Sequence, residues 1–157
     1  MRTLQRLVLL CLAVVFLASP ADAKVTVTFP NPAQFSDPDL HGFPVLPTVR
    51  AHLERLGARY LARNTDLSVA VLDLRLAGQN EWWRTTSSVR FMRDSTWPVM
   101  SVRYTLTQNG KVIASGEETI SDQFYLSRSR HVSSGPLAYE KAMLDDWFRE
   151  RFAGRTR

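Results

Sequence analysis

Residues 67–77 read LSVAVLDLRLA, and this stretch decides which fold is expected for the chain. Apolar side chains lie on both faces of the strand that it would form: Leu67, Val69 and Val71 on one, and Ala70, Leu72, Leu74 and Leu76 on the other. A strand that is apolar on both faces is typical of the covered centre of a sheet. The stretch therefore predicts a central strand.

The segments before this strand predict a parallel partner and a crossover helix. Residues 25–29 (VTVTF) alternate apolar residues with threonine, which predicts a short strand. Apolar residues recur at helical spacing over residues 47–63, where Pro47 suits the first turn. A strand, a helix and a second strand at this separation predict a right-handed parallel crossover.

The segments after the central strand predict an antiparallel continuation. Strands are expected near residues 89–92, over 99–107 and over 111–120, and the pair Asn109-Gly110 is the strongest short hairpin signal. An apolar stripe over residues 136–152 predicts the final helix. The whole pattern, β-α-β-β-β-β-α, predicts an α+β fold with a single mixed, mostly antiparallel sheet and two helices packed on one face.

Residues 1–23 have the three parts of a secretory signal peptide. Two arginines precede twelve consecutive apolar residues, 7–18, and Ala21 and Ala23 form a small-residue cleavage site. Twelve apolar residues are fewer than the about 20 that span a bilayer, so no transmembrane segment is expected. We expect cleavage after Ala23 and a periplasmic or secreted location. The soluble mature chain, 24–157, is expected to be a single globular domain with a basic C-terminal tail.

Charge and cysteine content narrow the function classes. The formal net charge is +5, and much of the excess lies in the tail, in Arg149, Arg151, Arg155 and Arg157. Export argues against a nucleic-acid partner, so the tail is either solvated or in contact with anionic envelope components such as phospholipid head groups. The only cysteine, Cys11, lies in the signal peptide, which excludes disulfides and thiol catalysis in the mature chain.

No local motif marks a catalytic or metal centre. The chain lacks a G-x-S-x-G elbow, and His52 shares a helix face with Arg59 and is expected in solvent. Asp37, Asp39 and His41 alternate in the stretch SDPDLHG, either as turn residues or as ligands of a hard cation. We expect the turn, and no metal or cofactor.

Three acidic residues, Asp73, Asp122 and Glu140, are candidates for a structural or a functional acid. Asp73 interrupts the apolar central strand on the face of Val69 and Val71, where a half-buried carboxylate needs a partner or a shifted pKa. Nearby strands offer Arg90, Arg93 and Arg103 for a salt bridge. The alternative is that Asp73 acts as a functional acid.

Two further features suit a binding role. Trp82 and Trp83 follow the central strand, where both pack inward or one remains exposed as a contact residue. Arg128, Arg130 and His131 precede the final helix, whose free N–H groups and positive end favour an anion. The alternative for this second segment is a solvated loop.

Four stretches carry a resemblance to a known family. They are VTVTFPNPAQFSD near the mature N-terminus, LDLRLAGQ at 72–79, KVIASGEETISDQFY at 111–125 and PLAYEKAMLDDWF at 136–148. With the signal peptide, they resemble the bacterial Domain of Unknown Function 3016 family. The resemblance implies a small exported protein of Gram-negative bacteria, and it implies no activity, cofactor or catalytic residue. The positions that match the family pattern are Asp73, Gly78, Gly116, Asp122, Glu140 and Trp147.

These observations favour an exported, non-catalytic binding domain of the cell envelope. Its partner would be an unidentified envelope component, either a protein or an anionic ligand. The alternative is an envelope hydrolase that uses Asp73, Asp122 or Glu140, so the assignment as an enzyme stays open. A third reading is a structural subunit of an envelope assembly.

Overall fold

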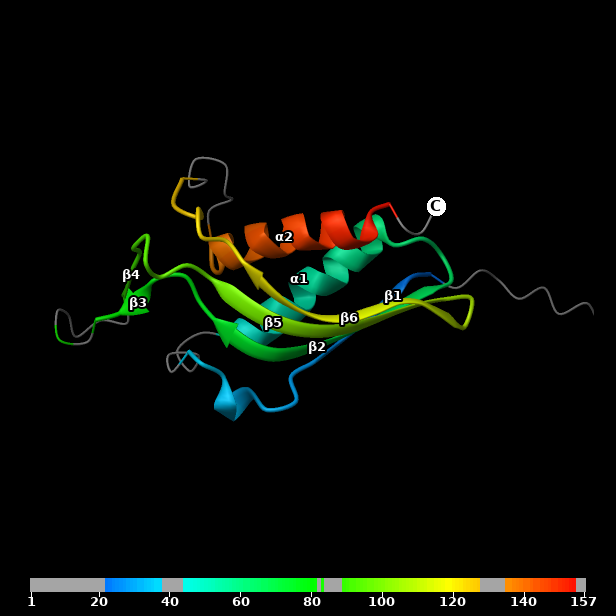
Figure 1. The fold of residues 1–157 in the computed structure, drawn as a ribbon, viewed down its shortest axis with the longest axis horizontal. Helices are drawn as coiled ribbons and strands as arrows, with labels where there is room; N and C mark the ends of the chain where they lie inside the picture. Colours follow the sequence, from blue (N-terminus) through cyan, green and yellow to red (C-terminus); the bar gives the residue numbers. More distant parts are fainter. Residues whose placement is uncertain (1–21, 38–43, 82, 84–88, 128–134, 155–157) are drawn as a thin grey trace, which may run out of the picture.

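A four-stranded sheet, with both helices on one of its faces, forms the body of the molecule (Figure 1). The computed structural model describes residues 22–37, 44–81, 83, 89–127 and 135–154. The elements, in chain order, are β1 (Lys24–Thr28), the 3-10 turn η1 (Pro32–Gln34), α1 (Val45–Tyr60), β2 (Thr65–Arg75), β3 (Gln79–Asn80), β4 (Arg90–Phe91), β5 (Val99–Gln108), β6 (Lys111–Ser121) and α2 (Ala138–Phe152).

The strand order in the main sheet is β1-β2-β5-β6. β1 runs parallel to β2, while β2 pairs antiparallel with β5 and β5 antiparallel with β6. This arrangement confirms the α+β class, the mixed sheet and the central position of the strand predicted over residues 67–77, which the structure places at 65–75. Among the described residues, no helix is long and apolar enough to cross a membrane.

The expectation of a single sheet is wrong at the strand near residue 90. β4 pairs antiparallel with β3 in a separate two-stranded ribbon beyond one end of the main sheet (Figure 1). The ladder of the main sheet ends at Arg75, and the chain turns at Gly78, whose positive φ of 73° is readily available only to glycine. A short strand carries little pattern, so its sequence does not reveal which strand it pairs with.

A β-bulge at Leu72 changes which residues of β2 face the helices. Val71 lies opposite Val102 of β5, but Asp73 lies opposite Ser101, so one residue of β2 has no cross-strand partner. Leu74 is therefore fully buried, and Asp73 turns to the uncovered face of the sheet. The expectation that Asp73 shares the face of Val69 and Val71 is wrong, because it assumed an unbroken two-residue period.

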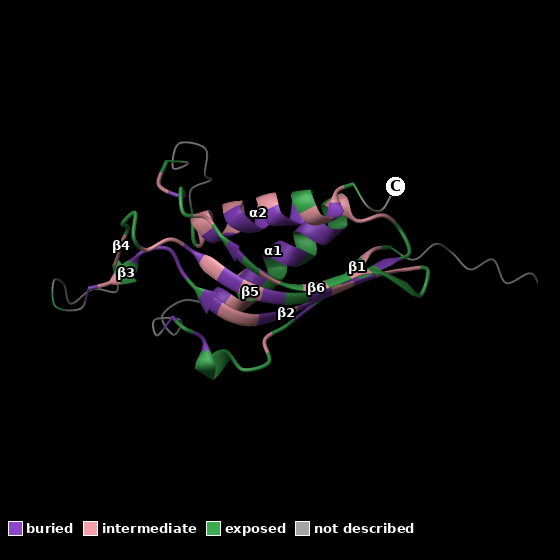
Figure 2. Cartoon of the chain, in the orientation of Figure 1, coloured by how far each residue is buried: buried purple, intermediate pink, exposed green. Residues whose placement is uncertain are grey.

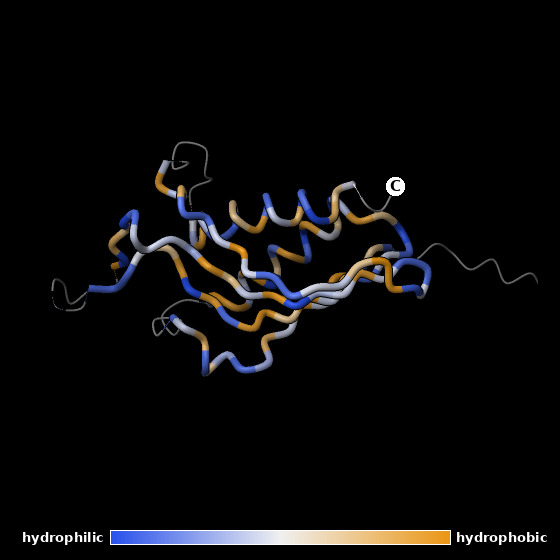
Figure 3. Tube along the Cα trace, in the orientation of Figure 1, coloured by the Kyte–Doolittle hydropathy of each residue, from blue (hydrophilic) through white to orange (hydrophobic). Residues whose placement is uncertain are grey.

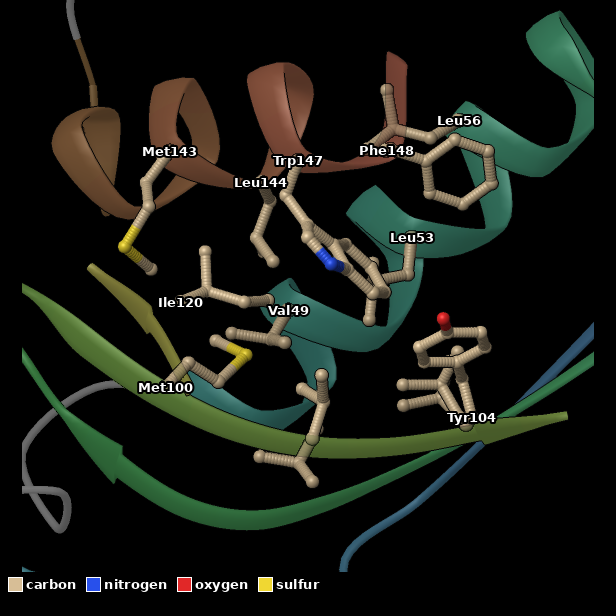
Figure 4. Close-up of a cluster of buried hydrophobic side chains, with 14 of the residues drawn as sticks. Val49, Leu53, Leu56, Met100, Tyr104, Ile120, Met143, Leu144, Trp147 and Phe148 are labelled. Atoms are coloured by element: carbon tan, nitrogen blue, oxygen red, sulfur yellow. The ribbon is translucent and has the colours of Figure 1, made fainter. Parts of the chain in front are cut away.

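The hydrophobic core lies between the sheet and the helices. Buried residues recur along the inner strands β2 and β5 and along both helices (Figure 2), and hydrophilic residues occupy the β5–β6 turn (Figure 3). In Figure 4, Leu144 and Trp147 of α2 point toward β5, with Leu53 of α1 beside them. On α2, the spacing of Leu144, Trp147 and Phe148 is the i, i+3, i+4 period of an amphipathic helix.

α2 also covers a residue that the sequence places in solvent. His52 of α1 is only 9% exposed, and its Nε2 lies 2.8 Å from Oδ1 of Asp145 on α2. Burial lowers the pKa of His52, and the Asp145 carboxylate opposes part of this effect. The expectation of a solvated histidine is wrong because α2, 93 residues away in sequence, packs on that helix face.

Gly57 sets the distance between α1 and the edge strand β1. A Cβ atom at this position would lie 2.0 Å from Cγ2 of Val25, far inside van der Waals contact. α1 thus packs directly against β1 at Gly57, where the helix has no side chain.

Replacing Gly57 with alanine should destabilise the fold. Overpacking against Val25 should cost about 1–3 kcal/mol, which exceeds the about 1 kcal/mol that alanine gains over glycine in a helix. Urea denaturation of the purified variant measures the change in free energy of unfolding.

The matched control is Gly154→Ala, because no atom lies within 4 Å of a Cβ there. Adding Gly57→Ala to a Val25→Ala background should cost less than adding it to the wild type. An equal cost in both backgrounds would show that Val25 is not the obstacle.

Candidate functional site

The segment 76–78 follows β2 without continuing the ladder of the main sheet, and carboxylates accept the hydrogen bonds of two of its N–H groups. The N–H of Leu76 donates to Oδ2 of Asp37 at 2.9 Å, and the N–H of Ala77 donates to Oε1 of Glu140 at 2.7 Å. Both carboxylate residues are buried, at 5% and 3% exposure. Buried backbone groups need such partners, so these two acids fix the path of the chain beyond the central strand.

Arg90 of β4 binds the same segment from its carbonyl side. Its Nε donates to the carbonyl of Ala77 at 3.0 Å, and its Nη2 donates to the carbonyl of Gly78 at 2.7 Å. Nη2 also lies 2.8 Å from Oδ2 of Asp37, in an ion pair that is largely buried. Charge neutralisation by Asp37 makes the burial of this guanidinium tolerable. We call Asp37, Arg90 and Glu140 the polar cluster.

Glu140 has the most perturbed environment in the polar cluster. Burial raises the pKa of its carboxyl group, and the nearby Asp37 charge raises it further, while the Ala77 N–H and Arg90 act in the opposite direction. The side chain also lines a cavity of about 150 Å³ together with Met92 and Tyr139.

A larger pocket of about 390 Å³ also has Arg90 in its lining. Its lining consists mainly of hydroxyl, amide and charged groups together with one indole: Ser36, Asp37, Arg75, Leu76, Gly78, Gln79, Asn80, Trp83, Arg90, Ser95 and Thr96. The volume lies within the range of small-molecule binding sites. We call this cavity the β2-end pocket.

Charge in the β2-end pocket is positive. Asp37 and Arg90 neutralise each other, whereas Arg75, the last residue of β2, is exposed and has no ion pair with a carboxylate among the described residues. The guanidinium carbon of Arg75 lies 5.9 Å from the ring centroid of Trp97, a cation–π distance. Trp83 at the pocket wall is 60% exposed.

Of the five proposed binding residues, the structure describes only Trp83. Trp83 lines the β2-end pocket, while Trp82 lies outside the described residues. Arg128, Arg130 and His131 also lie outside them, so the structure says nothing of an anion site before α2.

Asp73 binds a serine and none of the three arginines expected for it. Its carboxylate accepts hydrogen bonds from the N–H and the hydroxyl of Ser36, each at 2.6 Å, and from the N–H of Leu74. Partial burial raises the pKa of Asp73, but these hydrogen bonds outweigh it and the net pKa is lowered. The expected arginine partners bind other acids: Arg90 binds Asp37, Arg93 binds Glu81 and Arg103 binds Glu117.

The three candidate acids do not share a cavity in the described part of the chain. Asp122 follows β6, accepts a hydrogen bond from the N–H of Phe124, and lines a groove of about 340 Å³ with Glu118 and Trp147. Glu140 lines the small cavity beside Arg90. Asp73 binds the η1 segment on the uncovered face of the sheet.

Sequence reasoning missed the residues that build the β2-end pocket. Asp37 was interpreted as part of a turn, yet it pairs with Arg90. No sequence pattern marks Arg75 or Asn80 as a binding residue; they lie only near the end of an apolar strand. The alternation of Asp37 with Asp39 and His41 suggested a cation site; Asp39 and His41 lie outside the described residues.

Fold and site together define an α+β domain with a polar pocket at the carboxyl end of its central strand. Residues 23–150 match the family described as Protein of unknown function (DUF3016), and the chain belongs to that family. The match confirms the resemblance seen in the sequence. No curated protein and no solved structure matches the chain.

The polar cluster should make stability depend on pH through Glu140. A folded-state pKa above the usual value of about 4.5 means that the native state holds the proton more tightly. The free energy of unfolding should therefore fall as pH rises from about 4.3, the pKa of an unfolded glutamate, through the raised native value. Denaturant titrations at a series of pH values measure this slope.

Glu140→Gln should reduce the slope, because glutamine still accepts the Ala77 N–H but does not ionise. Glu140→Ala should instead cost about 1–3 kcal/mol, because it leaves that N–H without a partner. The control is Glu150→Gln, an exposed residue of the same helix. A Glu140→Gln variant with the wild-type slope would exclude Glu140 as its source.

Proposed function

We propose that this protein is an exported domain of the bacterial cell envelope that binds a ligand in the β2-end pocket and does not catalyse a reaction. One observation carries the proposal: a pocket of ligand size that is lined by an exposed tryptophan, Trp83, and by an arginine, Arg75, that forms no ion pair within 4 Å with a carboxylate of the described residues. Pockets with one aromatic wall and a few convergent polar groups are the usual form of a binding site.

The lining of the β2-end pocket favours binding over catalysis. Asp37 is the one carboxylate among the described lining residues, and hydrogen bonds from Leu76 and Arg90 already occupy its oxygens. The hydroxyl groups of Ser36 and Thr96 bond to Asp73 and to the Arg93 backbone, and no histidine is among the described lining residues. No described pair there has the nucleophile-and-base arrangement of a hydrolase.

The alternative of an envelope hydrolase has one observation in its favour, the raised pKa of Glu140. Its Oε1 is held by the Ala77 N–H, and neither Asp73 nor Asp122 lines the same cavity. General acid–base hydrolysis of this kind needs two groups placed on one substrate, so the arrangement of the three acids favours the binding function.

Export rests on the signal-peptide pattern of residues 1–23. Two features support it: β1 begins at Lys24, directly after the cleavage site, and the family match begins at residue 23. Cleavage after Ala23 leaves every strand of the main sheet and both helices intact.

Mass spectrometry of the protein from the periplasmic or secreted fraction should find Lys24 as the N-terminal residue. The matched control is Ala23→Arg, which removes the small residue before the cut and should block processing. Full-length protein in the cytosol would contradict export.

Photo-cross-linking in intact cells tests whether the β2-end pocket is where binding occurs. A photoreactive residue at Gln79, an exposed lining position on β3, should yield an adduct that intact-mass analysis detects. The control is the same probe at Val112, the second residue of β6, which is 63% exposed. The turn between β5 and β6 lies at the end of the sheet opposite the β3–β4 ribbon (Figure 1). Adducts from Val112 and none from Gln79 would contradict the assignment.

A further inference from the structure

We propose that the β2-end pocket recognises an acidic saccharide, that is, a sugar ring that carries a carboxylate or phosphate group. This inference rests on the proposed function and names its ligand class. Three groups around the pocket carry it: the guanidinium of Arg75, the side-chain carbonyl of Asn80 and the indole of Trp83. Each would contact a different part of one ligand: its anionic group, a hydrogen-bond donor and the face of its ring.

Arg75 supplies the site for the anionic group. Its guanidinium stacks on Trp97 and has no ion pair with a carboxylate among the described residues. Asp73, two residues earlier on β2, interacts with this charge, but its oxygens already accept hydrogen bonds from Ser36 and Leu74. The planar fork of Arg75 is thus positioned and available to bind two oxygens of a carboxylate or phosphate.

Asn80 supplies an acceptor that needs a donor. Its Oδ1 is buried and accepts no hydrogen bond from any described residue. A buried acceptor without a donor costs free energy, and a ligand hydroxyl or amide N–H would recover it once the Asn80 side chain turns toward the pocket. The backbone of Asn80 is fixed, because it pairs with Arg90 in the β3–β4 ribbon, and Asp37 holds the side chain of Arg90 in place.

Trp83 supplies a flat apolar wall, and the remaining lining is polar. A sugar ring presents C–H groups on its face and hydroxyls around its edge, so it contacts an indole and hydrogen-bonding side chains at the same time. Gln79 and Ser95 add an amide and a hydroxyl to this lining. A lipid tail or an apolar peptide would leave these polar groups without partners, which disfavours both.

The wall formed by the β3–β4 ribbon is closely packed. A Cβ at Gly78 would lie 2.7 Å from Sδ of Met92 and 2.9 Å from the carbonyl oxygen of Phe91. The ribbon therefore sits directly on the segment that leaves β2. This contact fixes the ribbon side of the pocket, which reduces the conformational entropy lost there when a ligand binds.

The test is an NMR titration of the purified protein with four probes that separate ring from charge. Glucose offers the ring alone, glucuronic acid and glucose 6-phosphate add an acidic group to it, and inorganic phosphate offers charge alone. The indole N–H signals of Trp83 and Trp97 should shift with the two acidic sugars. The indole of Trp147, which donates a hydrogen bond to Glu118 beside the separate groove of β6 and α2, is the internal reference.

Two variants and their matched controls locate the effect. Arg75→Gln and Trp83→Ala should each weaken binding of at least one acidic sugar about tenfold or more. Arg59→Gln removes another exposed arginine that lies over an aromatic ring, that of Tyr60, and should leave the affinity unchanged. Phe124→Ala removes a 75% exposed aromatic residue that is absent from the described lining, and should also leave it unchanged.

The outcomes separate this inference from the proposed function. Tighter binding of either acidic sugar than of both glucose and phosphate supports it, and the stronger of the two acidic probes identifies the group. Equal binding of glucose, or equal binding of phosphate alone, overturns it. If no probe shifts Trp83 or Trp97 while the Gln79 cross-link still forms, the saccharide assignment falls and the binding function stands.

Discussion

The guanidinium of Arg90 is the contact on which one end of this molecule depends. It joins Asp37, which follows the η1 turn, to the backbone carbonyls beyond the central strand β2, and it belongs to the separate β3–β4 ribbon. No strand pairing of the main sheet connects these three parts. Burying Arg90 without the carboxylate of Asp37 would be strongly unfavourable. The shape of the β2-end pocket therefore depends on this ion pair.

The two ends of the fold are therefore stabilised by different forces. Around β5 and the helices, Leu53, Leu144 and Phe148 are removed from water entirely, and hydrophobic burial holds the layers together. Beyond β2, hydrogen bonds between buried carboxylates and backbone N–H groups take that role. Such bonds are directional, which suits a site that must hold polar groups in fixed positions.

The β-bulge at Leu72 links the core to the site. By adding one residue to β2, it keeps both Val71 and Leu74 against the helices and turns Asp73 to the uncovered face, where Ser36 binds it. The same face carries Arg75 toward the pocket. One extra residue thus lets β2 carry core residues on one face and a residue of the pocket lining on the other.

The sequence by itself determined the class of fold, the central strand and the limits of both helices to within about three residues, because hydrophobic periodicity is a local property. It did not determine the separate β3–β4 ribbon, the bulge, the burial of His52 or the pairing of Asp37 with Arg90. Each of these depends on contacts between residues far apart in the chain: 93 residues separate His52 from Asp145, and 53 separate Asp37 from Arg90. Only the tertiary structure brings such groups together, so it alone decided where the pocket lies and which of its charges are neutralised.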